Sequence, residues 1–500
     1  MELLTNELTI DRIAGTAAAQ AVVEGELPLP LEHSEAEKVL DAVGSITLLS
    51  VEVLAGMIML DGTLAVDVIC ISPEGEPFSF RSKSNFRHTV NVEGAAVGMN
   101  ARVQPVLQTL TVAPKSQNSL KLDALVDLYC RVSDRSPMRV MTGILGVNDL
   151  ETLSNPVAIS ANENLGDVSA RVREEIAAPN IVNVLSSTAE VELNPVEMED
   201  NKALVEGVVN VNAICENNEG ELVELNQAIP FGELAPLNAN HAGNEISAQA
   251  NVAQLLVRPL GEGFDAVSVE AVVDVALENV SQSNPEVLAD AYSPSTPIQC
   301  NKESVSASCY YPPQSKKLTL RETVAVPSEL PDIASCVYVR AHPVITASAV
   351  ADGKLALDGL IFTRVVYRSG QGSLECFVED IPFLLEMEVP RGATDADVSV
   401  KCLSAGASGA GRSVEVCYTI LVCATPFALT QTEVVTGVSP AEAEEAPKGI
   451  VVYFAGNGET LWDVAKRFCT TKKALLSTNP NLAEPLKEGQ KLVLFLRRTS

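Results

Sequence analysis

Residues 449–496 read GIVVYFAGNGETLWDVAKRFCTTKKALLSTNPNLAEPLKEGQKLVLFL, and this stretch gives the clearest local prediction of a fold in the chain. The apolar run IVVYF predicts a strand that ends at a Gly-Asn-Gly turn. Thr460 then stands at the N-cap position of a helix whose apolar residues fall at helical spacing. A second short helix is expected over residues 472–477, and KLVLFL predicts a closing strand. The stretch therefore predicts a small strand-helix-helix-strand domain.

This arrangement, with GETLW in front and PLKEGQKL behind, resembles a LysM domain over residues 449–497. The resemblance implies a shallow groove for glycans that contain N-acetylglucosamine. In such a groove, backbone amides and amide side chains would meet the acetamido groups. The groove residues that the resemblance implies are Gly458, Glu459, Thr460, Leu461, Asn479, Pro480, Asn481 and Leu482.

Three residues depart from the usual LysM pattern, since Ala455 replaces Val, Glu459 replaces Asp and Cys469 replaces Gly. Cys469 is the most informative, because Gly at such a turn normally supplies a positive φ. Trp462 is the only Trp of the chain, and its helical spacing with neighbouring apolar residues predicts a place in the core.

The composition of the whole chain indicates several globular domains rich in sheet. Its 500 residues exceed what one hydrophobic core usually supports. Apolar residues make up 46% and charged residues 20%, which is typical of globular proteins. The net charge of −30 argues against binding of nucleic acid.

Neither a signal peptide nor an apolar stretch long enough for a membrane span is found, so we expect no membrane insertion. The eleven Cys have no CxxC pair, and most lie in apolar runs, as buried thiols in a reducing compartment do. We therefore expect a cytoplasmic protein.

The charge is distributed unevenly along the chain. Residues 449–500 hold eight basic and four acidic side chains, a net charge of +4, which leaves −34 for the rest. This tail can attract an acidic surface. A candidate docking surface comprises Lys466, Arg467, Lys472 and Lys473, and ordinary scatter of surface Lys is an equally good interpretation.

An internal repeat organises the remainder of the chain. The runs DGTLAVDVIC, EGVVNVNAIC and DGLIFTRVVY recur about 150 residues apart. Each is followed by a Phe, 24 residues after the Gly of its run. These landmarks are Gly62 and Phe86, Gly207 and Phe231, and Gly359 and Phe383.

Each copy shows alternating runs separated by turn residues, which predicts a mainly β module with a sandwich or barrel-like fold. A short amphipathic helix is expected over residues 35–43 of the first copy. The predicted division is 15–150, 165–285 and 300–428 for three tandem modules, 429–448 for an acidic flexible linker, and 449–497 for the LysM domain.

The repeated unit, an acid-Gly pair before a strand and then Ile-Pro-Phe, resembles the SPOCS domain of spore-coat-associated proteins. The first copy departs from it, with Ser84-Asn85-Phe86 in place of Ile-Pro-Phe. Tandem SPOCS domains before a C-terminal LysM domain resemble the layout of clostridial SipL-type coat assembly proteins. That layout implies a LysM domain that binds the ATP-hydrolysing basement protein of the coat, in the mother cell, at the forespore surface or in the spore coat.

No catalytic site, metal site or cofactor is predicted. The four His are dispersed, and no phosphate-binding loop or nucleophile elbow is found. Two pairs of acids, Asp123 with Asp127 and Glu270 with Asp274, share a strand face at a spacing of four. A hydrolytic carboxylate pair is conceivable, but a solvated sheet face is the better interpretation.

Three functions follow as hypotheses. The first is a non-enzymatic scaffold whose LysM domain docks on a protein partner, the coat ATPase. The second is a protein that binds peptidoglycan or another N-acetylglucosamine glycan. The third, a wall hydrolase with a LysM anchor, suffers from the lack of catalytic residues.

Overall fold

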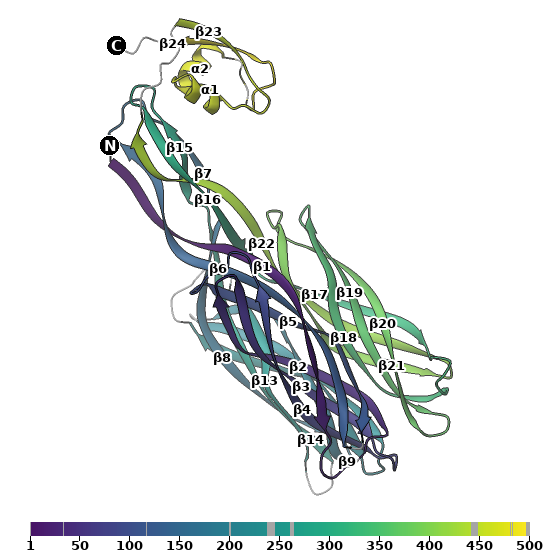
Figure 1. Cartoon of the computed structure of the whole chain (residues 1–500). Coiled ribbons are helices and arrows are strands. Elements are labelled where there is room, and N and C mark those ends of the chain that lie inside the picture. Colours follow the sequence, from purple (N-terminus) through teal and green to yellow (C-terminus); the bar gives the residue numbers. More distant parts are fainter. Residues whose placement is uncertain are drawn as a thin grey trace.

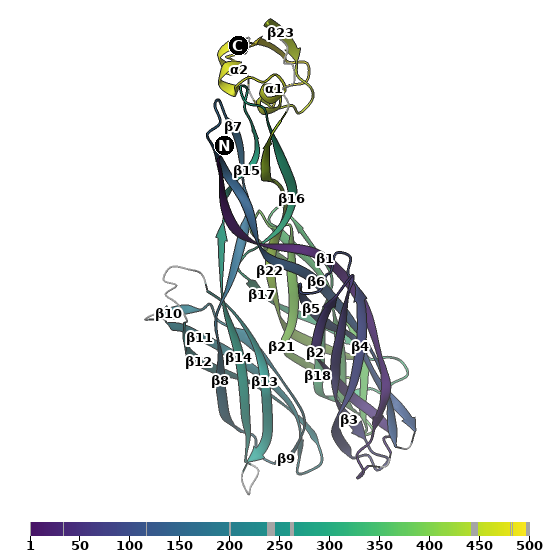
Figure 2. The same cartoon turned by 60° about the vertical axis from the view of Figure 1, so that its left-hand side comes forward.

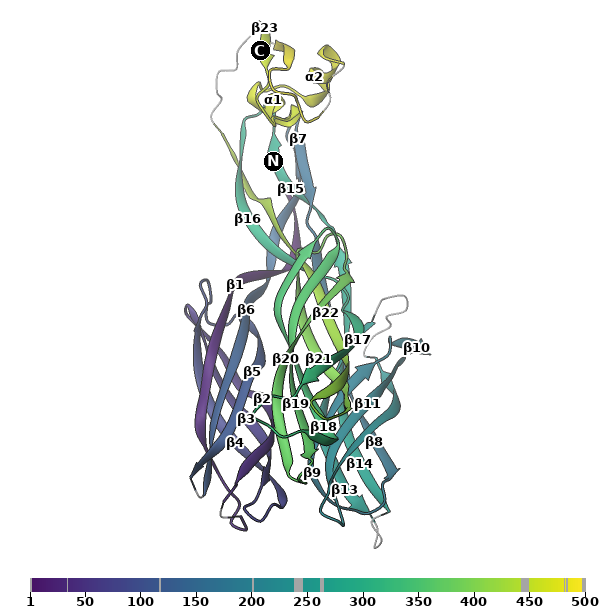
Figure 3. The ribbon, with the colours of Figure 1, turned by 90° about the vertical axis from the view of Figure 1, so that its right-hand side faces the viewer.

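The computed structural model describes residues 2–33, 35–116, 118–199, 202–237, 246–260, 265–441, 449–480, 482 and 484–496. Over these ranges the chain is mainly β, as predicted, and its two short helices lie near the C-terminus. Three β bodies lie side by side, a stalk of strands rises from them, and a small domain with helices sits at the end of the stalk (Figure 1 and Figure 3).

The first body consists of two three-stranded antiparallel sheets, with strand orders β1-β6-β5 and β2-β3-β4. Side chains along β3 are alternately buried and partly exposed, as expected for a strand with one face in a core. Residues of both sheets, such as Leu64 and Leu122, share that core. The strands are β1 (Glu2–Pro28), β2 (Lys38–Leu54), β3 (Met57–Ile71), β4 (Pro77–Asn91), β5 (Asn100–Ser116) and β6 (Ser119–Leu145).

The second body repeats this strand order, with sheets β8-β14-β13 and β9-β11-β12. A short strand, β10, also pairs with β11, and a separate two-stranded ribbon joins β7 to β15. The strands are β7 (Glu151–Pro156), β8 (Ile159–Ala177), β9 (Ile181–Leu193), β10 (Glu197–Glu199), β11 (Lys202–Asn217), β12 (Leu222–Pro236), β13 (Ile246–Leu260), β14 (Ala266–Ser283) and β15 (Glu286–Tyr292).

The third body follows the same order again, with sheets β17-β22-β21 and β18-β19-β20, and β16 also pairs with β22. The strands are β16 (Ile298–Tyr310), β17 (Gln314–Ala325), β18 (Ile333–Ala351), β19 (Lys354–Ser369), β20 (Leu374–Glu388), β21 (Asp395–Ala410) and β22 (Ser413–Pro440). The small C-terminal domain contains β23 (Gly449–Phe454), α1 (Leu461–Arg467), α2 (Lys472–Thr478) and β24 (Lys491–Leu496).

The Gly and Phe landmarks of the sequence repeat meet across the central strand of one sheet in every body. Their cross-strand pairs are Gly62 with Phe86, Gly207 with Phe231, and Gly359 with Phe383. A Cβ added to these glycines would lie 2.4, 3.0 and 2.3 Å from the facing Phe ring. The Gly is therefore required because the ring occupies the space that a side chain would need.

The stalk forms because the segments that enter and leave each body pair with each other beyond the body. The three ribbons are β1 with β6, β7 with β15, and β16 with β22 (Figure 2). The three ribbons contribute residues to a shared apolar layer, in which Val157 directly follows β7. The buried residues of this layer are Leu8, Val140, Val157, Val287, Val305, Ala307 and Val434.

The three ribbons also share a β-bulge just beyond this layer. One residue of the later strand is left out of the pairing in each ribbon, namely Thr142, Ala289 and Thr436. Bulges at corresponding positions show that the ribbons are equivalent structures and not accidental extensions.

A second shared cluster lies between the bodies themselves. Bulges in the second strand of each body fall at Leu40, Leu185 and Val337, and these side chains meet in one apolar cluster. Arg340 crosses this junction, where its Nε lies 3.2 Å from Asp41 Oδ2 and its guanidinium also donates to Ser186 and Thr188. One residue of the third body thus binds the first and the second.

The predicted helix over residues 35–43 is wrong, because residues 38–54 form β2. Ala36, Leu40 and Asp41 are all buried. The bulge at Leu40 interrupts the alternation of the strand, so the buried residues fall at a spacing that resembles a helix.

The predicted flexible linker over residues 429–448 is also wrong in its first part. Residues 429–440 belong to β22 and pair with β16, while residues 442–448 lie outside the described residues. The predicted division into modules stays a prediction, and strands β1, β8 and β22 run across its limits at residues 15, 165 and 428.

Gly207→Ala should destabilise the protein, whereas Gly232→Ala in the facing strand should not. The Cβ at Gly207 would lie 2.4 Å from the carbonyl oxygen of Glu192, but at Gly232 it would make only ordinary contacts of 3.6 Å or more. We expect a cost of about 1–3 kcal/mol for the first change alone. Differential scanning calorimetry should show a lower first unfolding temperature for Gly207→Ala; equal temperatures for the two variants would contradict the steric explanation.

Candidate functional site

The C-terminal domain is built as the sequence predicted. Thr460 caps α1, its Oγ1 accepts a hydrogen bond from the backbone of Asp463, and the Asp463 carboxylate accepts one from the backbone of Thr460. This reciprocal cap fixes where the helix begins. Strands β23 and β24 pair antiparallel over six residues each. Trp462 is buried in the domain core with Val464 and Leu475, as predicted.

Cys469 ends α1 with a left-handed residue. Its φ is +45°, its N–H donates to the carbonyl of Lys466, and the next N–H, of Thr470, donates to Ala465. This is the Schellman arrangement, in which Gly is the usual residue. The replacement of Gly by Cys noted in the sequence therefore places a side chain in a strained conformation.

The first loop of the predicted groove is held by the domain's own hydrogen bonds. Glu459 accepts from the Tyr453 hydroxyl at 2.9 and 3.0 Å and from the Gly456 amide at 3.0 Å. It also lies 2.8 Å from Arg467. Leu461 is buried, and its N–H donates to Glu484 at 3.0 Å.

The second loop of the groove is held in the same way. The Asn479 side-chain amide donates to the carbonyls of Leu475 and Val493, at 2.9 and 2.8 Å, and its oxygen accepts from the Val493 amide at 2.9 Å. Both ends of this amide therefore join α2 to β24. Pro480 is exposed, Leu482 is half-buried against the core, and Asn481 lies outside the described residues.

The four predicted basic residues have different surroundings. Lys466 contacts Asp290 of the stalk, Arg467 contacts Tyr453 and Glu459, and Lys472 lies 3.5 Å from Glu484. Lys473 is exposed. The predicted surface is thus divided, because Lys466 binds the chain's own stalk while Arg467 and Lys473 are exposed.

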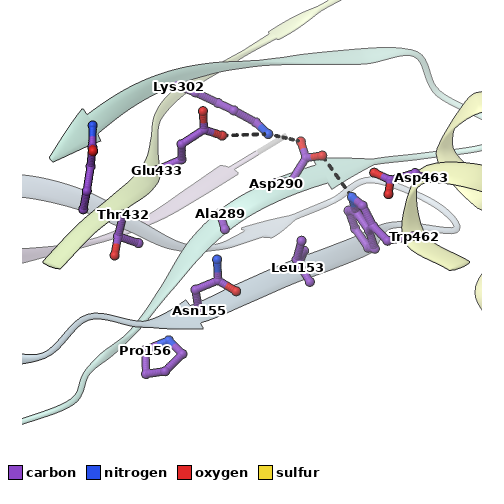
Figure 4. A pocket seen from close by; sticks show the side chains of 11 residues that line it. Leu153, Asn155, Pro156, Ala289, Asp290, Lys302, Thr432, Glu433, Trp462 and Asp463 are labelled. Carbon is purple, nitrogen blue, oxygen red and sulfur yellow. Dashed lines mark hydrogen bonds and ion pairs between the residues drawn. The ribbon is translucent and has the colours of Figure 1, made fainter. Parts of the chain in front are cut away.

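The stalk holds the C-terminal domain through one buried carboxylate, Asp290 on β15. Asp290 is 5% exposed, accepts a hydrogen bond from Trp462 Nε1 at 3.0 Å and lies 2.6 Å from Lys466 Nζ. Lys302 approaches it at 3.5 Å from β16 (Figure 4). Burial alone would raise the pKa of Asp290, but the hydrogen bonds from Lys466 and Trp462, together with the charge of Lys302, lower it below its ordinary value.

Aromatic contacts reinforce this junction. Tyr292 of β15 lies edge-on to Trp462, with ring centroids 4.9 Å apart, and its hydroxyl donates to the carbonyl of Thr470 at 2.8 Å. Leu153 of β7 packs against the same core. The domain is therefore fixed on the second ribbon of the stalk and not merely tethered to it.

Asp290 is specific to that ribbon. It directly follows the bulge at Ala289, and the residues that follow the equivalent bulges are Gly143 and Gly437. No repeat pattern in the sequence marks this difference as functional. Only the position of the helix α1 beside β15 shows it.

A hollow of about 530 Å³ opens beside this contact. Carboxylates, amides and one amine line it, and Figure 4 shows Lys302 between Asp290 and Glu433. Lys302 lies 3.7 Å from Glu433, a side chain that is largely exposed. The hollow separates the C-terminal domain from strands β16 and β22.

The two acid pairs of the sequence analysis lie apart, each on its own sheet, and their side chains have ordinary partners. Asp123 lies 2.8 Å from Lys121, and Asp127 accepts from Gln20 at 3.0 Å. In the second body Glu270 approaches two arginines, and Asp274 accepts from Ser169. Such contacts are typical of the solvated face of a sheet.

Within the described ranges no group of three or more His, Cys, Asp or Glu side chains could hold a metal ion.

The fold and the site define a protein of repeated β modules that presents one small binding domain at the end of a stalk. Comparison with family models identifies the parts. Residues 35–115 and 332–405 match the model described as SipL, SPOCS domain, and residues 456–495 match the LysM domain. The chain therefore combines SPOCS segments with a C-terminal LysM domain, which confirms the predicted SipL-type architecture. No curated protein matched the chain.

The two SPOCS segments cover the same part of their bodies, from β2 into β5 and from β18 into β21. The middle body lies outside both segments, so its assignment as a further SPOCS module stays a prediction.

SPOCS and LysM are both non-catalytic families of binding domains. In the part of the chain that the structure describes, no helix combines the length and the apolar character that a membrane span requires.

Asp290→Ala should release the LysM domain from the stalk, at a cost of about 1.5–3 kcal/mol in docking free energy, because a charged hydrogen-bond acceptor is lost. Small-angle X-ray scattering should show a more mobile LysM domain, and the Trp462 emission should shift to the red. Glu433→Ala, in the same hollow, is the matched control and should change neither. An unchanged scattering curve for Asp290→Ala would show that other contacts hold the domain.

Cys469→Gly should stabilise the LysM domain by about 0.5–1 kcal/mol, because Gly relieves the left-handed strain at a small entropic cost. Trp462 is the only Trp, so its fluorescence during urea unfolding reports on this domain. A higher urea midpoint is expected for Cys469→Gly. Cys469→Ala is the control, since it removes the thiol but keeps the Cβ; equal midpoints for both variants would point to the thiol and not the backbone.

Proposed function

We propose that this protein is a non-enzymatic scaffold of bacterial spore coat assembly, whose LysM domain docks on the coat morphogenetic ATPase. The matched SPOCS and LysM domains support a spore-coat-associated protein that is able to bind glycan. The ATPase as partner rests on the resemblance to SipL-type proteins. The proposed location is the mother-cell side of the forespore surface.

The observation that carries this proposal is the way in which the LysM domain is presented. It sits at the end of the stalk, fixed through Asp290, Tyr292 and Leu153. The bodies and stalk hold a net charge of −34 and the LysM segment +4. The stalk thus separates a basic binding domain from acidic bodies, which favours approach of an acidic protein surface to the tip.

Hydrogen bonding inside the LysM groove favours a protein partner over a glycan. A groove for N-acetylglucosamine needs free amides for the acetamido group. Here both the nitrogen and the oxygen of the Asn479 side-chain amide already make hydrogen bonds inside the domain, and the Leu461 N–H donates to Glu484. A glycan would have to break these bonds or use the remaining backbone.

Glycan binding is the second candidate, because the LysM match itself supports it. Gly458 has a φ of +74° and lies exposed with Pro480 on the two groove loops. These positions keep the groove open to a ligand that contacts mainly the backbone.

The two candidates are separated by one binding experiment on the full-length chain. The purified coat ATPase and purified peptidoglycan sacculi are each incubated with the protein, and retention is measured by co-sedimentation or pull-down. We expect capture of the ATPase and no retention on sacculi. Retention on sacculi alone would replace the scaffold by a cell-wall protein.

Lys473→Glu should weaken capture of the ATPase by about threefold to tenfold, because an exposed charge at an interface mainly alters the rate of association. Lys473 suits the test since it is exposed, whereas Lys466 and Lys472 have partners inside the chain. Lys202→Glu on the second body changes the net charge equally and serves as control. Equal capture by both variants, measured by biolayer interferometry, would remove the electrostatic part of the proposal.

A further inference from the structure

The outer face of the LysM ribbon is an exposed apolar surface. Side chains alternate along β23, so Val451 and Tyr453 pack toward the helices while Ile450, Val452 and Phe454 face solvent. Their exposures are 69%, 49% and 60%, and that of Phe495, which pairs with Ile450, is 58%. We call these four residues the ribbon face.

The charge beside the ribbon face is basic. Lys491 is exposed and pairs directly with Phe454, and neither β23 nor β24 contains an acidic residue. Among the described residues, the stalk's hydrogen bonds to the LysM domain reach α1 and Thr470. A contiguous apolar surface of this kind commonly marks an interaction site.

The third body carries a second exposed row, on strand β20, which is an edge strand of its sheet. Val378 is 48% exposed and Leu384 75% exposed, the latter among the most exposed large apolar side chains of the bodies. Acidic residues surround them. The row comprises Val378, Asp380, Pro382, Leu384, Glu386 and Glu388, and Asp358 pairs with Leu384 from β19. We call this the β20 row.

Three neighbouring cations reduce the charge of the β20 row only in part. Lys316 donates to the backbone carbonyl of Glu386 at 2.7 Å, and Arg364, which pairs with Val378, lies 3.5 Å from Asp41 of the first body. Lys354 lies 3.5 Å from Glu386, and both side chains are more than 60% exposed, so the pair is weak. Asp358, Asp380 and Glu388 remain exposed around Leu384. The row is therefore apolar and acidic, the complement of the apolar and basic ribbon face.

The other two bodies do not repeat this combination. The landmark Phe residues fix the correspondence, so the positions of Val378, Asp380 and Leu384 are Arg81, Lys83 and Arg87 in the first body. In the second body they are Asn226, Ala228 and Gly232. In the first body Arg81 and Arg87 are paired with Asp67 and Asp61, so its row offers no exposed apolar and acidic surface. The fold therefore does not require an acidic, apolar row.

The two faces of one chain are kept apart. The LysM domain is fixed at the end of the stalk, and β20 lies in the bodies at the other end of the molecule (Figure 1). We therefore propose that the ribbon face of one chain docks on the β20 row of a second copy. Because the two surfaces differ, the contact is heterologous, and each chain keeps one free surface of each kind, so repetition builds a chain of molecules that is open unless its rotation closes it into a ring.

Sedimentation velocity of the full-length protein between about 1 and 200 µM tests this, since a contact made by a face of four apolar residues is small and small interfaces are weak. The weight-average mass should rise above the single-chain 53.0 kDa with concentration. Phe454→Ser and Leu384→Glu should each keep the protein monomeric. Leu256→Ser, an exposed Leu of the second body, is the control and should associate as the parent does.

Mixing the two variants gives the decisive result. The Phe454→Ser chain keeps its β20 row and the Leu384→Glu chain keeps its ribbon face, so an equimolar mixture should form one-to-one pairs and nothing larger. A monomeric parent at all concentrations, or a mixture that stays monomeric, would overturn the proposal. Loss of ATPase capture by Phe454→Ser without any change in mass would assign the ribbon face to the partner and overturn it equally. The mass experiments contain no ATPase, so their outcome is independent of the function proposed above.

Discussion

Pairing between the segments that enter and leave each body is the constraint on which the whole molecule depends. In the first copy β1 stays paired with β6 along its full length, so the same two strands close a body and then form a ribbon of the stalk. Three such ribbons bury an apolar layer that includes Leu8, Val157 and Val305. A two-stranded ribbon alone is marginal in water, and three ribbons together stabilise one another. The stalk therefore exists only because the module occurs three times.

Equivalence of the ribbons also explains how a single residue can determine on which ribbon the LysM domain docks. Gly143 and Gly437 follow the bulge in two ribbons, and Asp290 follows it in the third. A carboxylate buried at 5% exposure needs partners, and Lys466 and Trp462 provide them. Because only one ribbon offers this acceptor, the domain docks in one of three otherwise similar positions.

The sequence predicted those features that depend on local pattern. The cap at Thr460, the core position of Trp462 and the repeat of Gly and Phe follow from spacing alone, since neighbours along a helix or across a strand pair impose them. The helix over residues 35–43 failed because a bulge at Leu40 changed the strand's period. The linker failed because residues 429–440 carry a strand whose partner, β16, lies more than a hundred residues earlier. Contacts at such distance, including that of Asp290 with α1, leave no periodic trace in one sequence.

Divergence between the copies indicates where binding specificity was added to a shared framework. The glycine beneath the Phe ring is the same in all bodies, because any side chain there would meet the ring. The outward positions of the same strand pair are free of that constraint, and they range from Arg81 and Arg87 in the first body to Val378 and Leu384 in the third. Inward residues thus preserve the fold while outward residues differ in charge. A rigid array of three such modules can present different surfaces in fixed relative positions, which a flexible string of the same modules could not do.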